Sequence, residues 1–145
     1  MHEDGKSHSG TVVWLEGTAP VYASSKKQKI VTKSSYEAEL VALSDGASQV
    51  IWSRDFLMSQ GYKVRSAVIK QDNKSTIVSA EKGRSTSDLS RHINIRYFWV
   101  KDKIDSEDVM LEYTPTEDMI ADLLTKPLQG QLFITLRNRL LNWYL

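Results

Sequence analysis

Three acidic residues of the 145-residue chain stand where α/β proteins commonly build sites: Glu39, Asp72 and Asp122. Glu39 lies early in a predicted helix, Asp72 directly follows a predicted strand, and Asp122 falls in the helix predicted after the last strand. Ligands of open sheets gather at the carboxyl ends of strands, so these carboxylates can meet although they are far apart in sequence. Each acid taken alone is better explained as a solvated or helix-capping residue, because the helix dipole stabilises acids near helix N-termini.

The composition restricts the chemistry that such acids can support. The chain contains no cysteine, which excludes a disulfide framework and thiolate zinc sites. A bound metal is therefore expected to be held by oxygen. Mg²⁺ prefers octahedral oxygen coordination at about 2.0–2.1 Å and retains water ligands, so carboxylates suit magnesium better than a zinc cage. Manganese remains an alternative.

The overall charge gives no general attraction to a polyanion. Lysine and arginine total 19 against 18 acids, for a net charge of +1, so any nucleic-acid site must be local. No apolar stretch approaches the roughly 18 residues of a membrane span, and the polar N-terminus lacks a secretory signal. We therefore expect a soluble intracellular protein without membrane contact, in a cytoplasmic particle or the nucleus. Its length and 41% hydrophobic content predict one compact domain.

The elements that must position the acids alternate between strands and helices. Residues 1–10 are polar and turn-like. Strands are predicted at Thr11–Leu15, Ala19–Ser25, Ala67–Gln71 and Val109–Tyr113, and helices at Tyr36–Ser59, Lys74–Glu81, Ile93–Ile104, Thr116–Leu124 and Gln131–Leu145. The first two strands read as a hairpin. The order β-β-α-β-α-α-β-α, followed by the C-terminal helix, implies a mixed sheet with helices packed against it.

Several segments together resemble the ribonuclease H region at the end of copia-type retrotransposon polyproteins. They are Ser24-Ser-Lys-Lys-Gln-Lys29, Ser34-Ser-Tyr-Glu-Ala-Glu-Leu-Val-Ala-Leu43, Gln71-Asp-Asn-Lys-Ser75, Arg91-His-Ile-Asn-Ile-Arg-Tyr97 and Tyr113-Thr-Pro-Thr-Glu-Asp-Met-Ile-Ala-Asp-Leu-Leu-Thr-Lys-Pro127. The resemblance runs from about Lys6 to about Gln129 and is specific to this lineage.

The resemblance implies an α/β fold of the ribonuclease H-like type, a mixed five-stranded sheet with flanking helices. It further implies hydrolysis of the RNA strand of an RNA:DNA hybrid during reverse transcription, beside an adjacent reverse transcriptase domain. The family uses two divalent ions, with Glu39, Asp72 and Asp122 matching its carboxylates here. Glu37 is the alternative to Glu39, which is preferred because Leu-Val-Ala-Leu follows it. Two such ions, roughly 3.5–4 Å apart, activate a water and stabilise the leaving oxygen.

The chain departs from the family at its beginning. The family's first strand carries an aspartate about a dozen residues before a Ser-x-Ser-Gly turn, here Ser7–Gly10, so that strand is expected to be missing. Asp4, in the N-terminal segment, is disfavoured as its replacement. Because the metal-binding aspartate would be absent with that strand, this chain by itself is expected to be inactive. The missing strand is also expected to be central, so the chain would lose strand hydrogen bonds and a buried face. The domain is assigned to residues 1–130, with residues 131–145 as its C-terminal amphipathic helix.

Further residues are candidates for contacting the hybrid substrate. Asn73 and Ser75 stand at a helix N-terminus, where backbone amides suit a phosphate, although helix capping explains them equally well. Arg91, His92 and Arg96 form a basic cluster, of which Arg91 and His92 are the candidates for contacting phosphates. Lys26, Lys27 and Lys29 either follow a nucleic-acid backbone or are simply solvated. We assign Tyr97, Trp99, Trp14, Trp52 and Trp143 structural roles.

Two functions from different classes follow. The first is a metal-dependent endoribonuclease. The alternative is a catalytically inactive ribonuclease H-like module that binds hybrid or tethers the polymerase. A third hypothesis is a decayed reading frame without a folded product.

Overall fold

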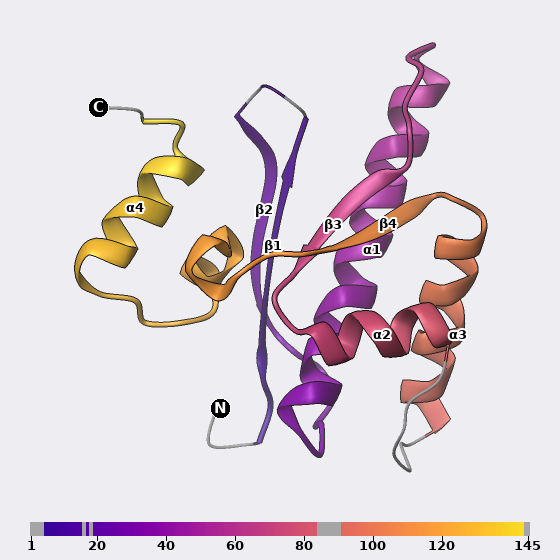
Figure 1. Ribbon diagram of the computed structural model, residues 1–145, viewed down its shortest axis with the longest axis horizontal. Helices are drawn as coiled ribbons and strands as arrows, with labels where there is room; N and C mark the ends of the chain where they lie inside the picture. Colours follow the sequence, from indigo (N-terminus) through magenta and orange to yellow (C-terminus); the bar gives the residue numbers. More distant parts are fainter. Residues whose placement is uncertain (1–4, 16, 18, 84–90, 144–145) are drawn as a thin grey trace. The chain divides into compact units, whose positions relative to one another are not determined.

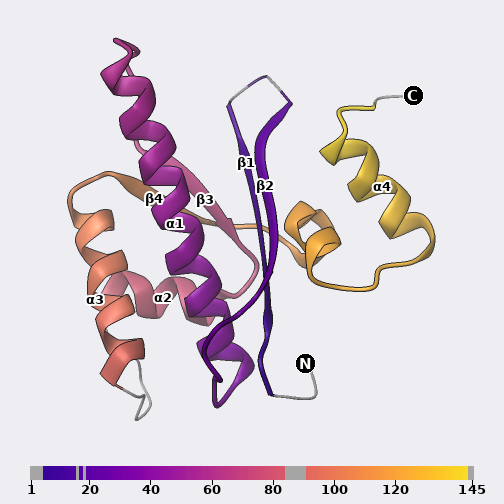
Figure 2. The ribbon, with the colours of Figure 1, turned by 180° about the vertical axis from the view of Figure 1, so that it is seen from behind.

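The computed structural model describes residues 5–15, 17, 19–83 and 91–143, and Figures 1 and 2 show it from opposite sides. Its elements are β1 (His8–Trp14), β2 (Pro20–Lys27), α1 (Ser35–Ser59), β3 (Ala67–Gln71), α2 (Lys74–Lys82), α3 (Arg91–Asp105), β4 (Val109–Tyr113), the 3₁₀ helices η1 (Thr116–Asp118) and η2 (Ile120–Leu124), and α4 (Gly130–Leu140).

The chain divides into two compact units. Residues Met1–Ala38 and Thr114–Leu145 form one, called here the hairpin unit, and residues Glu39–Tyr113 form the other, called the parallel-strand unit. All but the first turn of α1 belongs to the parallel-strand unit. Each unit holds one two-stranded sheet among its described residues, so the single five-stranded sheet remains a prediction.

The parallel-strand unit is built on β3 and β4, which pair in parallel from Ala67 opposite Val109 to Gln71 opposite Tyr113. Helix α2 follows β3 after two residues and contacts α3, and both helices contact β4. Helix α2 begins where the Asn73 side chain accepts from the Thr76 amide and ends at Gly83, which adopts a left-handed conformation. These are standard start and stop signals of a helix.

The core of this unit lies between α1, α2, α3 and β4. Its buried apolar side chains are Leu40, Val41, Leu43, Ala47, Ala80, Ile93, Tyr97, Val100 and Val109. Helical spacing predicts an apolar stripe of Ile93, Tyr97, Val100 and Ile104 on α3; the first three are at most 1% exposed, and Ile104 is half-buried. The packing role predicted for Tyr97 is therefore confirmed.

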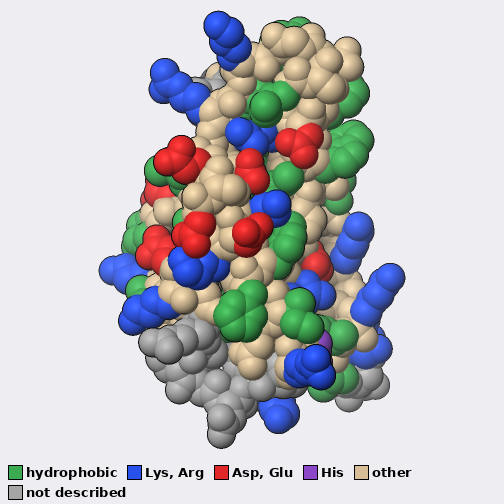
Figure 3. Space-filling model, turned by 90° about the vertical axis from the view of Figure 1, so that its right-hand side faces the viewer, with side chains coloured by type: hydrophobic (Ala, Val, Ile, Leu, Met, Phe, Trp, Pro, Cys, Tyr) green, Lys and Arg blue, Asp and Glu red, His purple; other side chains and the backbone are tan. Residues whose placement is uncertain are grey.

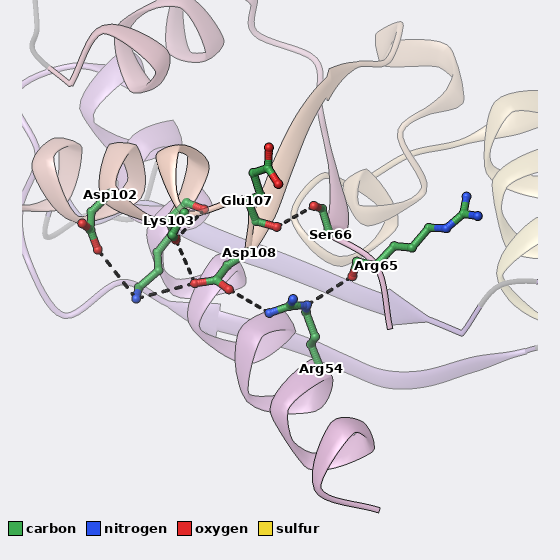
Figure 4. A network of polar contacts seen from close by, with 8 residues as sticks. Arg54, Arg65, Ser66, Asp102, Lys103, Glu107 and Asp108 are labelled. Atoms are coloured by element: carbon green, nitrogen blue, oxygen red, sulfur yellow. Dashed lines mark hydrogen bonds and ion pairs between the residues drawn. The ribbon is translucent and has the colours of Figure 1, made fainter. Parts of the chain in front are cut away.

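A network of polar contacts lies at the end of this unit where β3 and β4 begin (Figure 4). Arg54 of α1 forms an ion pair with Asp108 at 2.8 Å, and its Nε donates to the carbonyl of Arg65. Lys103 of α3 lies 3.8 Å from the other Asp108 oxygen, and Ser66 donates to the carbonyl of Glu107. The network joins α1 and α3 to the start of both strands.

The hairpin unit consists of β1 and β2, the short helices η1 and η2, and α4. The strands pair antiparallel from His8 opposite Lys27 to Trp14 opposite Pro20, with a bulge after Val13. Strand β1 contacts η2, and η2 contacts α4. The buried apolar residues of this unit are Val13, Ala38 and Leu136 among those described.

Three local predictions need correction. Ser7–Gly10 is not a turn, because β1 already starts at His8. The helix predicted over Thr116–Leu124 is two 3₁₀ helices separated by Met119, whose backbone is extended. Trp52 is not a core residue, because it is 64% exposed; its ring stacks on that of Phe56, itself 51% exposed.

Candidate metal and nucleic-acid site

Asp72 occupies the carboxyl end of the parallel strands, as its sequence position predicted. It directly follows the last residue of β3, and its side chain is half-buried. The preceding Gln71 is 7% exposed, and its Oε1 accepts from the Asn73 amide at 3.1 Å. Asn73 in turn caps α2. Hydrogen bonds on both sides of Asp72 therefore define the backbone that presents its carboxylate.

A contact between the two strand ends lies beside Asp72. Lys74 Nζ stands 4.5 Å from the centre of the Tyr113 ring, and Tyr113 is the last residue of β4, opposite Gln71. A cation over an aromatic face contributes roughly 0.5–1 kcal/mol at an exposed site. The interaction joins the segment after β3 to the end of β4 and places a positive charge near the strand ends.

The structure separates the two glutamates that compete for the first carboxylate position. Glu37 is 2% exposed, its amide donates to Ser34 Oγ, and its Oε2 accepts from the Lys33 amide at 2.6 Å. This arrangement resembles a capping box, in which the acid satisfies backbone groups at the start of a helix. Glu39 is half-buried. Glu37 thus has a structural role at the start of α1.

Asp122 lies in η2 and already has a cationic partner. Its side chain is 12% exposed, and Oδ2 accepts from Lys126 Nζ at 2.7 Å. The amide of Lys126 also donates to the carbonyl of Asp122 at 2.9 Å. A metal ion approaching this carboxylate would compete with Lys126 for Oδ2.

The donor chemistry of the three acids fits a hard divalent cation, because all are carboxylates. Glu39 and Asp72 belong to the parallel-strand unit, and Asp122 belongs to the hairpin unit. Among residues 5–15, 17, 19–83 and 91–143, no three histidine or acidic side chains are grouped closely enough to hold a metal. Asp4 lies outside the described residues.

Asn73 and Ser75 combine a helix start with exposed polar groups. The Asn73 side-chain oxygen accepts from the Thr76 amide at 3.2 Å, which confirms the capping interpretation. The side-chain amide is then the donor that Asn73 can offer to a phosphate oxygen. Ser75 is exposed in the first turn of α2, where the backbone dipole favours an anion.

The basic cluster at the start of α3 divides into two roles. Arg91 and His92 are exposed in its first turn. Arg96 instead donates to Ser44 Oγ and forms a 2.9 Å ion pair with Asp45, linking α3 to α1. Figure 3 shows lysine and arginine interleaved with acidic side chains on the face that carries α3. A phosphate contact on this face would therefore depend on individual residues, not on a broad basic field.

Sequence reasoning missed several polar residues around these acids. Lys126 was detectable, since it follows Asp122 by four residues, a spacing that brings side chains together on a helical turn. Gln71 and Gln28 carried no comparable signal. Gln28 donates from Nε2 to Ser9 Oγ at 2.8 Å and to the carbonyl of Ala38 at 2.9 Å, contacts that depend on the fold.

Comparison with known proteins identifies relatives among retrotransposons. The chain is 31% identical over 124 residues to the retrovirus-related Pol polyprotein from transposon TNT 1-94 of Nicotiana tabacum. It is 33% and 32% identical over 132 residues to those from transposons RE1 and RE2 of Arabidopsis thaliana. These alignments cover 86–90% of the chain but 9% of each polyprotein. The homologues of this chain are thus retrovirus-related Pol polyproteins.

Comparisons with protein-family models and with solved structures identify no further relatives: no protein-family model matches the chain, and no solved structure matches it. Within the described residues, none of the helices combines the length and the apolar character required to cross a membrane.

Proposed function

We propose that this chain is the ribonuclease H region of a copia-type retrotransposon polyprotein and takes part in hydrolysing the RNA strand of RNA:DNA hybrids. The observation that carries the proposal is the position of Asp72 at the carboxyl end of the parallel strands, within a chain whose homologues are Pol polyproteins. Active sites of α/β folds gather at such strand ends. The ribonuclease H-like fold is part of the same proposal.

Glu39, Asp72 and Asp122 are the residues proposed to hold two Mg²⁺ or Mn²⁺ ions. When bound, such ions supply an activated water and charge stabilisation at the leaving oxygen. Asp72 would present its carboxylate from a backbone held by Gln71 and Asn73. Asp122 would exchange its contact with Lys126 for one with the ion.

The remaining candidates would orient the hybrid. The side-chain amide of Asn73 and the hydroxyl of Ser75 are donors suited to a phosphate of the scissile strand. Arg91 and His92, exposed at the start of α3, would contact phosphates further along the duplex. Since each phosphate contact releases counterions, binding is expected to weaken as salt rises. The adjacent reverse transcriptase domain is the proposed partner within the polyprotein.

One observation favours the alternative of a module that binds hybrid without cleaving it. The Asp122 carboxylate forms a 2.7 Å ion pair with Lys126, a contact that a metal ion at the same oxygen would have to displace. In such a module the hybrid would be bound by Arg91, by His92 and by the side-chain donors of Asn73 and Ser75, and it would not be hydrolysed.

The test is cleavage of a labelled RNA strand in an RNA:DNA hybrid with Mg²⁺. Because the chain spans 9% of its relatives, the assay compares it with a longer piece of the polyprotein extended upstream by about fifteen residues, enough for one strand and a turn. We expect the longer piece to cleave. Asp72→Asn should reduce its rate by at least about a hundredfold, the upper end of losses for groups that only support metal ligands.

Two matched variants sharpen the assay. Glu39→Gln should abolish cleavage as Asp72→Asn does, whereas Glu37→Gln should leave the rate per folded molecule unchanged and lower stability by about 1 kcal/mol through the weakened cap. Well-folded proteins that bind hybrid but never cleave it would replace the nuclease with the binding module. Loss of cleavage in Glu37→Gln but not in Glu39→Gln would reverse the ligand assignment.

A further inference from the structure

The polar and glycine residues at the start of β1 have no role in the chemistry proposed above. His8 and Gly10 belong to the Ser-x-Ser-Gly segment, and Ser25 belongs to the first of the segments that carry the family resemblance. All three lie in the hairpin formed by β1 and β2. The structure brings them together against η2, the helix that contains Asp122.

Gly10 permits the close approach of β1 to η2. A Cβ atom added to Gly10 would lie 2.7 Å from the carbonyl oxygen of Ala121 and 2.8 Å from Cγ2 of Thr125. Contacts of this length force a shift, and the first involves backbone, which cannot rotate away. Glycine inside a strand often marks such a close approach. Any other residue at position 10 would displace η2 from the hairpin.

A hydrogen-bond relay holds the same contact from the neighbouring strand. Ser25 Oγ donates to the carbonyl of Leu124 at 2.6 Å, and His8 Nε2 lies 2.7 Å from the same Oγ. A serine hydroxyl has one hydrogen to donate. Because Leu124 receives it, His8 must donate through Nε2–H to Ser25. His8 thereby orients the hydroxyl toward η2.

We propose that Gly10, Ser25 and His8 are positioning residues for Asp122, forming a clamp that holds η2 against the hairpin. The clamp acts on the backbone on both sides of Asp122, since Ala121 precedes it and Leu124 follows two residues later. The proposal rests on the proposed function only in treating Asp122 as the group that needs positioning. The clamp itself is a property of the fold and can be measured without metal or substrate.

The first measurement uses the complete 145-residue chain in solution. Hydrogen exchange of the Lys126 amide, which donates to the Asp122 carbonyl, reports the integrity of η2, and the ¹³C resonance of the Asp122 carboxyl reports its surroundings. Ser25→Ala should accelerate this exchange about fivefold, as expected for loss of one neutral hydrogen bond, and shift the carboxyl resonance. Ser25→Thr, which keeps the hydroxyl, should restore both.

Two further variants define the control and the stronger perturbation. Ser24→Ala, on the opposite face of the same strand, should leave both signals unchanged. Gly10→Ala should displace η2 and accelerate exchange more than Ser25→Ala. Unchanged exchange and an unchanged carboxyl resonance in Ser25→Ala would overturn the clamp, whether or not Gly10→Ala folds.

Mn²⁺ titration separates failure of the clamp from failure of the proposed function. If the unaltered chain binds Mn²⁺ through Asp122, Ser25→Ala should raise the binding midpoint by about tenfold, the lower end for groups that support a metal ligand. An unchanged midpoint would overturn the positioning role. If Asp122→Asn does not affect Mn²⁺ binding, Asp122 is not a metal ligand and the proposed metal site fails. The clamp is then tested only by the exchange of the Lys126 amide and the Asp122 carboxyl resonance.

Discussion

The two units of this protein are stabilised in different ways. The parallel-strand unit buries a set of apolar side chains that includes Leu40, Ile93 and Tyr97, each at most 1% exposed. The hairpin unit buries Val13, Ala38 and Leu136 among its described residues and relies on individual polar contacts such as that of Ser25 with Leu124. Apolar burial is the main favourable term in folding, so the two units should differ in local stability.

The difference bears directly on the candidate site. Glu39 and Asp72 stand on elements fixed by a packed core, whereas Asp122 stands on a 3₁₀ helix held by a glycine contact, one hydroxyl and Lys126. Packed interiors change little when one surface contact is lost, because many neighbours restrict each side chain. The geometry of Asp122 should therefore be the most sensitive of the three to substitutions outside the site.

The largest effect on the free energy of unfolding should come from truncating a core side chain of the parallel-strand unit. Leu40→Ala removes a fully buried side chain and is expected to lower the free energy of unfolding by about 2–5 kcal/mol, measured by urea denaturation. Leu136→Ala is the matched change in the hairpin unit, since Leu136 is also 0% exposed. It should accelerate hydrogen exchange in η2 and α4 while α3 keeps its protection. Equal loss of protection in α3 would show that the units unfold together.

An intermediate effect is expected from the network at the start of β3 and β4. The Arg54 and Asp108 side chains are 15% and 25% exposed, so truncating either leaves a partly buried charge. Arg54→Ala should cost about 1–3 kcal/mol, below the loss for a fully buried pair. A double-mutant cycle with Asp108→Ala measures the coupling. Additive losses would mean that the ion pair contributes nothing and that packing of the arginine stem accounts for the effect.

The smallest effect should come from the exposed ion pair of the hairpin unit. Arg139 of α4 lies 2.5 Å from Asp118 of η1, with side chains 43% and 45% exposed. Such pairs are screened by water and contribute little, so Arg139→Ala should change the unfolding free energy by less than about 0.5 kcal/mol. A larger loss of unfolding free energy in chemical denaturation would mean that the hairpin unit depends on this pair to join α4 to η1.

Local signals in the sequence predicted much of the secondary structure. The predicted strand Ala67–Gln71 agrees with β3, Asn73 and Gly83 bound α2, and three of the four residues of the apolar stripe of α3 are buried. These features depend on neighbouring residues, whose periodicity and capping chemistry can be read directly. The same reading placed Asp72 at the end of a strand. Homology to Pol polyproteins agrees with the lineage that the motifs indicated.

Other features depend on contacts between distant segments. The apolar spacing of α1 could not show that Trp52 faces outward, because its helical position decides burial only once neighbouring elements are in place. The segment 116–124 forms two 3₁₀ helices where a helix was predicted. Its packing against Gly10 and its bond from Ser25 join residues about a hundred positions apart.

The sequence by itself thus determined which residue types could hold a cation and which strand and helix ends would carry them. Only the tertiary structure decided that Gly10 of β1 packs against η2 and that Ser25 of β2 donates to the carbonyl of Leu124. The physical reason is the range of the interactions. Helix and strand formation respond to neighbours within a few residues, whereas a close backbone contact or a hydrogen bond between distant segments exists only after the chain has folded.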